Sequence, residues 1–76
     1  MLISLHFREV KKNVVTQGEP FLINVNHIEI IRPTPQYKTA HSDIFTLSDS
    51  ENPYSVFESI YEIQTMISDL VSNSPK

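Results

Sequence analysis

Hydrophobic and polar residues alternate along the first two thirds of the chain, and this pattern predicts short β-strands. In residues 2–10, Ile3, Leu5 and Phe7 fall on one side and mostly polar residues on the other. This two-residue period is typical of a half-buried strand. Similar patterns predict four further strands, at residues 21–25, 27–32, 43–47 and 54–56.

Two segments rich in turn-forming residues divide the predicted strands. Residues 17–20 contain the only glycine, which accepts positive φ angles, followed by a proline that fixes its own φ. Residues 49–53 combine aspartate, serine, asparagine and proline. Both segments predict turns. Residues 11–13 form a polar break, and residues 14–16 fit either an extension of the first strand or the start of another.

Prolines end the predicted third strand, because proline has no amide proton for a sheet hydrogen bond and holds the preceding residue extended. Residues 33–41 then form the longest polar connection. We expect this connection to be the most mobile loop of the chain. Its marker residues are Arg32, Pro33, Pro35 and Tyr37.

The last predicted element is a helix that begins at residue 60 and ends at residue 71. Ser59 and Glu62 form a capping-box pattern, in which each side chain binds the other residue's amide. Apolar residues recur at three- and four-residue spacing and predict one buried face. They are Ile60, Ile63, Met66, Ile67, Leu70 and Val71.

Sequential strands followed by one helix predict an α+β fold, a small bent antiparallel sheet of about five strands with the helix packed on it. The sheet is either open or closed into an SH3-like barrel. We expect residues 1–72 to form a single domain and residues 73–76 a disordered tail. A chain of 76 residues without cysteine has marginal stability, and self-association into a homo-oligomer is one remedy.

The net charge is −3, and the charged residues are unevenly distributed along the chain, with six of the nine acidic residues after residue 38. An acidic half disfavours non-specific binding to nucleic acids and anionic membranes, since both require a cationic face. No apolar run has membrane-spanning length. These observations predict a cytoplasmic protein without nucleic-acid or membrane partners.

No catalytic pattern is visible. The spacing of His6, His27 and His41 matches no metal site, and one glycine cannot build a phosphate-binding loop. His41 and Asp43 share a face of the predicted fourth strand, but surface strands commonly carry such residues. We therefore expect no enzymatic activity, no cofactor and no metal.

The charged residues suggest two surfaces. An acidic set on the solvent side of the fifth strand and the helix is either a solvated face or a patch that captures a basic protein partner. Arg8, Lys11 and Lys12 form a small basic cluster, which is a solvated hairpin tip or a phosphate contact. The acidic set comprises Asp49, Glu51, Glu58, Glu62 and Asp69.

The order of elements resembles the small FlbD-like family of flagellar and swarming-motility proteins, and similar short proteins of bacteria and phages. The matching segments are residues 21–24 (FLIN), 27–33 (HIEIIRP), 44–47 (IFTL) and 56–63 (VFESIYEI). The Asn-Gly turns usual in that family are replaced here. The resemblance implies a non-catalytic accessory protein that works through protein contacts.

Together these patterns predict a non-enzymatic interaction module that self-associates and docks a protein partner. A second hypothesis is a phage-type inhibitor whose acidic face blocks a basic, nucleic-acid-binding host protein. A third is an SH3-like barrel that binds nucleic acid through its basic cluster.

Overall fold

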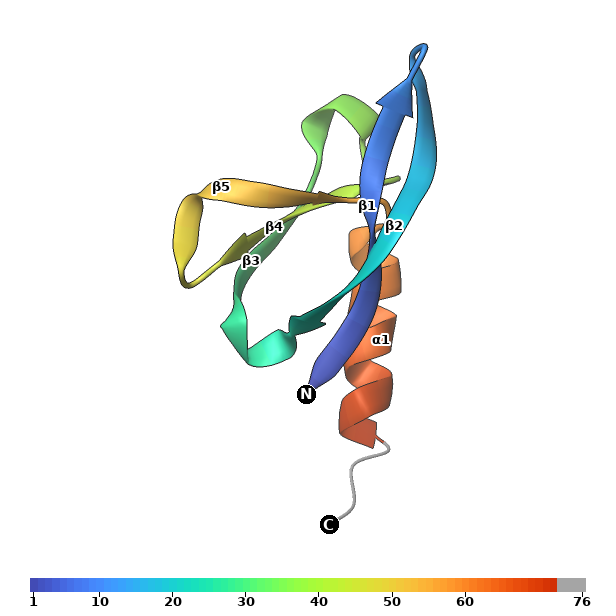
Figure 1. Cartoon of the computed structure of the whole chain (residues 1–76). Helices are drawn as coiled ribbons and strands as arrows, with labels where there is room; N and C mark the ends of the chain where they lie inside the picture. The colour runs from blue at the N-terminus through green and yellow to red at the C-terminus, as the bar shows by residue number, and fades with distance from the viewer. Residues whose placement is uncertain (73–76) are drawn as a thin grey trace.

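The computed structural model describes residues 1–72, so the predicted disordered tail at residues 73–76 lies outside the described residues. Five strands come first and one helix follows (Figure 1). The elements are β1 (Leu2–Lys11), β2 (Val14–Asn24), the 3-10 turn η1 (Val25–His27), β3 (Ile28–Pro33), the 3-10 turn η2 (Pro35–Tyr37), β4 (Ser42–Thr46), β5 (Asp49–Val56) and α1 (Ile60–Ser72).

The strands form one antiparallel sheet in the order β2-β1-β5-β4-β3, and the predicted α+β fold is confirmed. The sheet is open, because β2 and β3 are its two edges and do not pair with each other in the described chain. In residues 1–72, β1 pairs with β5 only at Phe7 and Val56. The sheet is therefore a β1–β2 hairpin joined at one point to a β3–β4–β5 meander. β1 lies between β2 and β5 in the strand order.

The β1–β2 hairpin turns at Lys12 and Asn13, which have φ angles of 52° and 65°. Two successive positive φ angles in a two-residue loop are typical of a type I′ turn, whose twist matches that of the flanking strands. The polar break in the sequence is thus the hairpin turn. Residues 14–16 begin β2 instead of extending β1.

The prediction of a turn at residues 17–20 is wrong, because β2 continues through them. Arg8 pairs with Gln17 whereas His6 pairs with Pro20, so this part of β2 contains a bulge opposite Phe7. Gly18 does not use a positive φ angle. A Cβ atom there would lie 2.7 Å from the carbonyl oxygen of Phe7. Glycine is required for this close backbone approach.

We therefore expect Gly18→Ala to lower the free energy of unfolding by about 1–3 kcal/mol, because the backbone must move to admit the methyl group. Urea denaturation of both proteins measures the difference. Thr16→Ala on the same strand, with an exposed side chain, is the control. An alanine at position 18 that costs no more than this control would contradict the close approach.

The predicted turn at residues 49–53 is also misplaced, because the turn lies at residues 47 and 48. Thr46 pairs with Asp49 across a two-residue turn, and Ile44 then pairs with Tyr54. Residues 50–53 are therefore an outward bulge within β5, which begins at Asp49 and not at Tyr54. Asp49 Oδ1 stabilises the bulge, because it accepts hydrogen bonds from the backbone amides of Glu51 and Asn52, each at 3.2 Å.

The predicted loop begins later than expected. Arg32 and Pro33 belong to β3, where Pro33 is opposite Ser42 of β4. Pro35 and Tyr37 lie in η2. The mobility of this connection stays a prediction.

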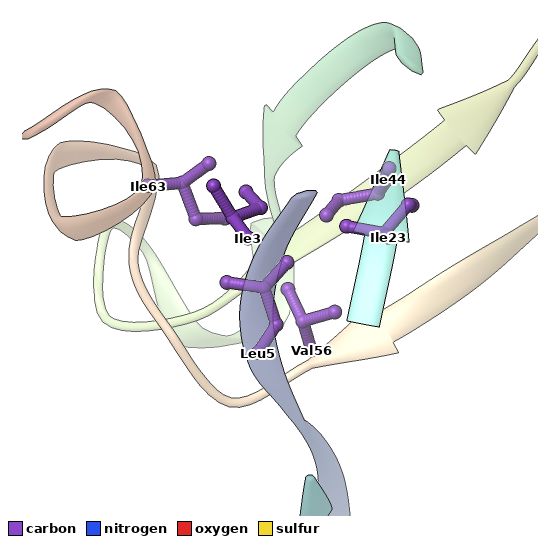
Figure 2. Close-up of a cluster of buried hydrophobic side chains, with 6 residues drawn as sticks. All are labelled: Ile3, Leu5, Ile23, Ile44, Val56 and Ile63. Atoms are coloured by element: carbon purple, nitrogen blue, oxygen red, sulfur yellow. The ribbon is translucent and has the colours of Figure 1, made fainter. Parts of the chain in front are cut away.

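Helix α1 and the sheet meet in a core of six buried side chains (Figure 2). The predicted capping box is present, since the amide of Glu62 donates to Ser59 Oγ at 3.1 Å and that of Ser59 to Glu62 Oε1 at 3.3 Å. Val71 is exposed and does not belong to the buried face. The core residues are Ile3, Leu5, Ile23, Ile44, Val56 and Ile63.

Candidate functional site

Three aromatic side chains meet at the junction of the hairpin and the meander. The rings of Phe7 and Phe21 are stacked, with centroids 4.3 Å apart, and the Tyr54 ring lies 6.0 Å from Phe21. With Leu22 they line a groove of about 360 Å³, which we call the aromatic groove. Its other lining residues are Ile23, Asn24, His27, Thr46 and Ser48.

The strand register explains why these aromatic side chains are not fully buried. Phe7 follows Ile3 and Leu5 on the inward side of β1, but it lies opposite the β2 bulge, beyond the six-residue core. It remains 39% exposed, and Tyr54 and Leu22 are 45% and 66% exposed. The core face of β1 thus continues into an open apolar surface.

Glu58 does not lie on the solvent side as predicted. It is 5% exposed, at the point where the chain passes from β5 into α1. His6 of β1 donates its Nδ1–H to Glu58 Oε2 at 2.7 Å and its backbone amide to Oε1 at 2.9 Å. The Ser42 hydroxyl donates to the Glu58 carbonyl at 2.8 Å. Glu58 therefore fixes the start of the helix and is not available to a partner.

Arg8 is also directed into the protein. It donates to Thr34 Oγ1 at 2.7 Å and to Asp43 Oδ1 at 3.2 Å, and its guanidinium carbon lies 5.1 Å from the centre of the Tyr37 ring. The side chains of Arg8 and Asp43 are only 10% and 16% exposed. The predicted basic cluster is therefore divided, with Arg8 half-buried in an ion pair and both lysines exposed.

His41 and Asp43 do not form the pair that their spacing suggested. Asp43 binds Arg8, whereas His41 donates Nδ1–H to the carbonyl of Phe57 and contacts the Tyr37 ring edge to face. These contacts attach the loop around η2 to β1 and to the start of the helix. Every buried side-chain polar atom in residues 1–72 has a hydrogen-bond partner.

The remaining acidic residues are exposed but divided between two places. Asp49 and Glu51 lie at the start of β5, next to the groove-lining Thr46 and Ser48. Glu62 and Asp69 lie on α1. Figure 1 shows the start of β5 and the helix on opposite sides of the molecule.

Asp49 is held in its ionised form by its neighbours. Hydrogen bonds from the Asn52 side chain, and from the Glu51 and Asn52 amides, lower the pKa of the Asp49 carboxyl below its ordinary value. The carboxylate of Asp49 is thus stabilised in its charged form within the β5 bulge.

Within residues 1–72, no group of three or more histidine, cysteine, aspartate or glutamate side chains is arranged to hold a metal ion. No helix in this part of the chain combines the length and apolar character that a membrane crossing needs.

Comparisons with known proteins do not assign the chain to a family. No family model matches it, and no curated protein or solved structure does so either. The fold alone therefore defines the class of the protein. It is a small α+β domain with an open antiparallel sheet and an exposed aromatic groove. The FlbD-like resemblance stays a prediction.

Proposed function

We propose that this protein is a non-enzymatic, cytoplasmic interaction module that acts through self-association and protein–protein contacts. The observation that carries this proposal is the aromatic groove, in which Phe7, Leu22 and Tyr54 are between 39% and 66% exposed. A small domain gains nothing in solubility from such a surface. Contiguous apolar patches on small proteins mark interaction sites.

The composition of the groove is suited to protein partners. Aromatic side chains are enriched at protein interfaces, where they supply large contact area at low cost in conformational entropy. Asn24 and Ser48 line the same groove and can supply hydrogen bonds to a partner. A resemblance to FlbD-like accessory proteins is consistent with this role and supplies no catalytic residue.

The geometry favours this proposal over the two alternatives. An acidic inhibitor requires a continuous negative face, but Glu58 is bound to His6 and the other acids lie on separate elements. A nucleic-acid site at the hairpin would retain only Lys11 and Lys12, because Arg8 is paired with Asp43. Two lysines neutralise too few phosphates for appreciable affinity.

Light scattering after gel filtration tests the self-association. We expect the average mass of the wild-type protein to rise above the monomer value of 8.8 kDa as the concentration increases. Tyr54→Ser should shift this rise to at least tenfold higher concentration, because it removes an exposed ring from the groove. Circular dichroism checks that the variant is folded.

Tyr61→Ser is the matched control, since Tyr61 is 60% exposed on α1, outside the groove. This variant should associate like the wild type. A wild-type protein that remains monomeric at all concentrations, or a Tyr61→Ser variant as impaired as Tyr54→Ser, would refute the proposed role of the groove.

A further inference from the structure

Strand β2 is one edge of the sheet, and in residues 1–72 it pairs with β1 alone. Its outer half, residues 14–17, belongs to the end of the hairpin that extends away from the rest of the molecule (Figure 1). We call these residues, Val14, Val15, Thr16 and Gln17, the outer β2 edge. None of them is charged. A strand at the edge of a sheet offers unpaired backbone groups to another strand.

The pairing of β2 with β1 shows which backbone groups point off this edge. Lys11 and Val14 flank the two-residue turn and are hydrogen-bonded to each other, as its type I′ geometry requires. Along an antiparallel ladder, hydrogen-bonded and non-hydrogen-bonded pairs then alternate. Val15, opposite Val10, and Gln17, opposite Arg8, are therefore in non-hydrogen-bonded pairs. Their N–H and C=O groups point away from β1.

The other free edges of the described sheet carry features that oppose pairing. Strand β3, the opposite edge, contains two charged residues and a proline, and its register against β4 is irregular. The inner half of β2 contains Glu19 and Pro20. Beyond Phe7, the free side of β1 carries three charged residues. Charges, prolines and bulges protect edge strands from pairing, and the outer β2 edge has none of them.

The outer β2 edge of a second copy matches that of the first in register. In an antiparallel pair with a two-fold axis at Thr16, Val15 of each copy lies opposite Gln17 of the other. Each of these two pairs exchanges both N–H···O bonds, so the contact has four backbone hydrogen bonds. The two Thr16 side chains face each other at the axis, and threonine pairs of this kind stabilise sheets.

The charges just beyond the paired residues are complementary. Asn13 lies three residues before Thr16, and Glu19 lies three residues after it. The antiparallel arrangement therefore brings the turn of one copy, which contains Lys12, beside Glu19 of the other. Both side chains are exposed, and the two-fold axis repeats this contact at the other end. The same segment supplies both halves of the contact, which favours a second copy as its partner.

We propose that two copies of this protein pair through their outer β2 edges and form a symmetric dimer with one continuous sheet. This inference rests on the proposed self-association and adds a contact outside the aromatic groove. The same surface is used on both copies, so the contact closes at the dimer. It involves few residues, so the dimer should be transient and form at higher concentration than the groove contact.

Single cysteines test the register, because the chain has none of its own. Across the axis, the Cα atoms of the two Thr16 residues lie about 4.5 Å apart, within the limit of about 7 Å for a disulfide. The two Val14 residues are four positions out of register, about 14 Å apart. In oxidised glutathione, Thr16→Cys should therefore form disulfide-linked dimers at least about tenfold faster than the matched control Val14→Cys.

Gln17→Pro tests the backbone hydrogen bonds. Proline at this position removes an N–H that points off the free edge and retains the pairing with β1. Pro20 already occupies such a position, because the amide and carbonyl of its partner His6 bond to Glu58 and Phe57 and not to β2. The variant should therefore stay folded, which circular dichroism checks. In the Thr16→Cys background it should slow cross-linking at least about tenfold, because it removes two of the four bonds.

Equal cross-linking rates for Thr16→Cys and Val14→Cys, or a rate that Gln17→Pro leaves unchanged, would overturn the edge pairing. If Tyr54→Ser still delayed the rise in mass of the protein, the groove contact would then stand alone. Fast cross-linking of Thr16→Cys, with no effect of Tyr54→Ser on the mass, would support the edge pairing and refute the role of the groove.

Discussion

Replacement of Ile63 by aspartate is expected to unfold the domain. Ile63 is fully buried and is the contribution of helix α1 to the central core (Figure 2). The substitution removes about 1.5–3 kcal/mol of apolar burial and leaves a carboxylate with no partner in a core of aliphatic side chains. That combined cost exceeds the roughly 5 kcal/mol available to a marginally stable small domain. The far-UV circular dichroism spectrum and thermal melt measure the result.

Gln64→Asp is the matched control, because residue 64 is the next position on the same helix and its side chain is exposed. Surface substitutions of this kind change the free energy of unfolding by about 0.5 kcal/mol or less. The control should melt cooperatively near the wild-type temperature. An Ile63→Asp variant that did the same would show that α1 does not complete the core.

The elements were predictable where one local pattern has one structural meaning. The alternation of Ile3 and Leu5 with polar residues fixes a strand and its inward face. The spacing of apolar residues after Ser59 fixes a helix, and the capping box fixes where it begins. Both inferences need only neighbouring residues, and the structure contains both elements.

The two misplaced turns show where local patterns become ambiguous. Glycine and proline occur in turns, but they also occur in bulges, where a strand is locally irregular and continues. Gly18 is needed because the backbone of Phe7 comes close to it. That approach depends on the register of β1 against β2, which residues 17–20 alone do not reveal.

The charged residues were assigned to the surface because most charged side chains are exposed. Glu58 and Arg8 are exceptions because partners from distant parts of the chain compensate their burial. His6 lies 52 positions from Glu58, and Asp43 lies 35 positions from Arg8. Such pairs become visible only when the strand order is known.

The aromatic groove was missed for a related reason. By residue type alone, aromatic side chains such as Phe7, Phe21 and Tyr54 are expected in a core. A domain of this size has too little interior to bury all of them. The strand order determines which remain at the surface, and the open junction between β1 and β5 leaves these three there.

The second large effect is expected for Arg8→Met. Methionine retains much of the apolar length of arginine but leaves the Asp43 carboxylate, only 16% exposed, without its positive partner. Thr34, which is 7% exposed, also loses the donor to its hydroxyl. Breaking a buried ion pair from one side costs about 3–5 kcal/mol. Urea denaturation should show a loss near the lower end of that range, because solvent reaches part of the pair.

Arg32→Met separates this effect from the general loss of an arginine. Arg32 is exposed and its guanidinium carbon lies 5.0 Å from the centre of the Phe45 ring. An exposed contact of this type contributes about 0.5–1 kcal/mol, so the control should be much milder. Equal losses for Arg8→Met and Arg32→Met would mean that the Arg8–Asp43 ion pair contributes no more to stability than an exposed cation–π contact does.

A double-mutant cycle then isolates the interaction between the two charges. Asp43→Asn removes the negative charge and leaves a side chain of similar size. If Arg8→Met destabilises mainly by leaving Asp43 unpaired, the double variant should be at least about 1 kcal/mol more stable than the sum of the single losses predicts. Additive losses would attribute the effect to the contacts of Arg8 with Thr34 and Tyr37 instead. In either case the loop around η2 depends on a residue of β1, 26 positions before Thr34 in the chain.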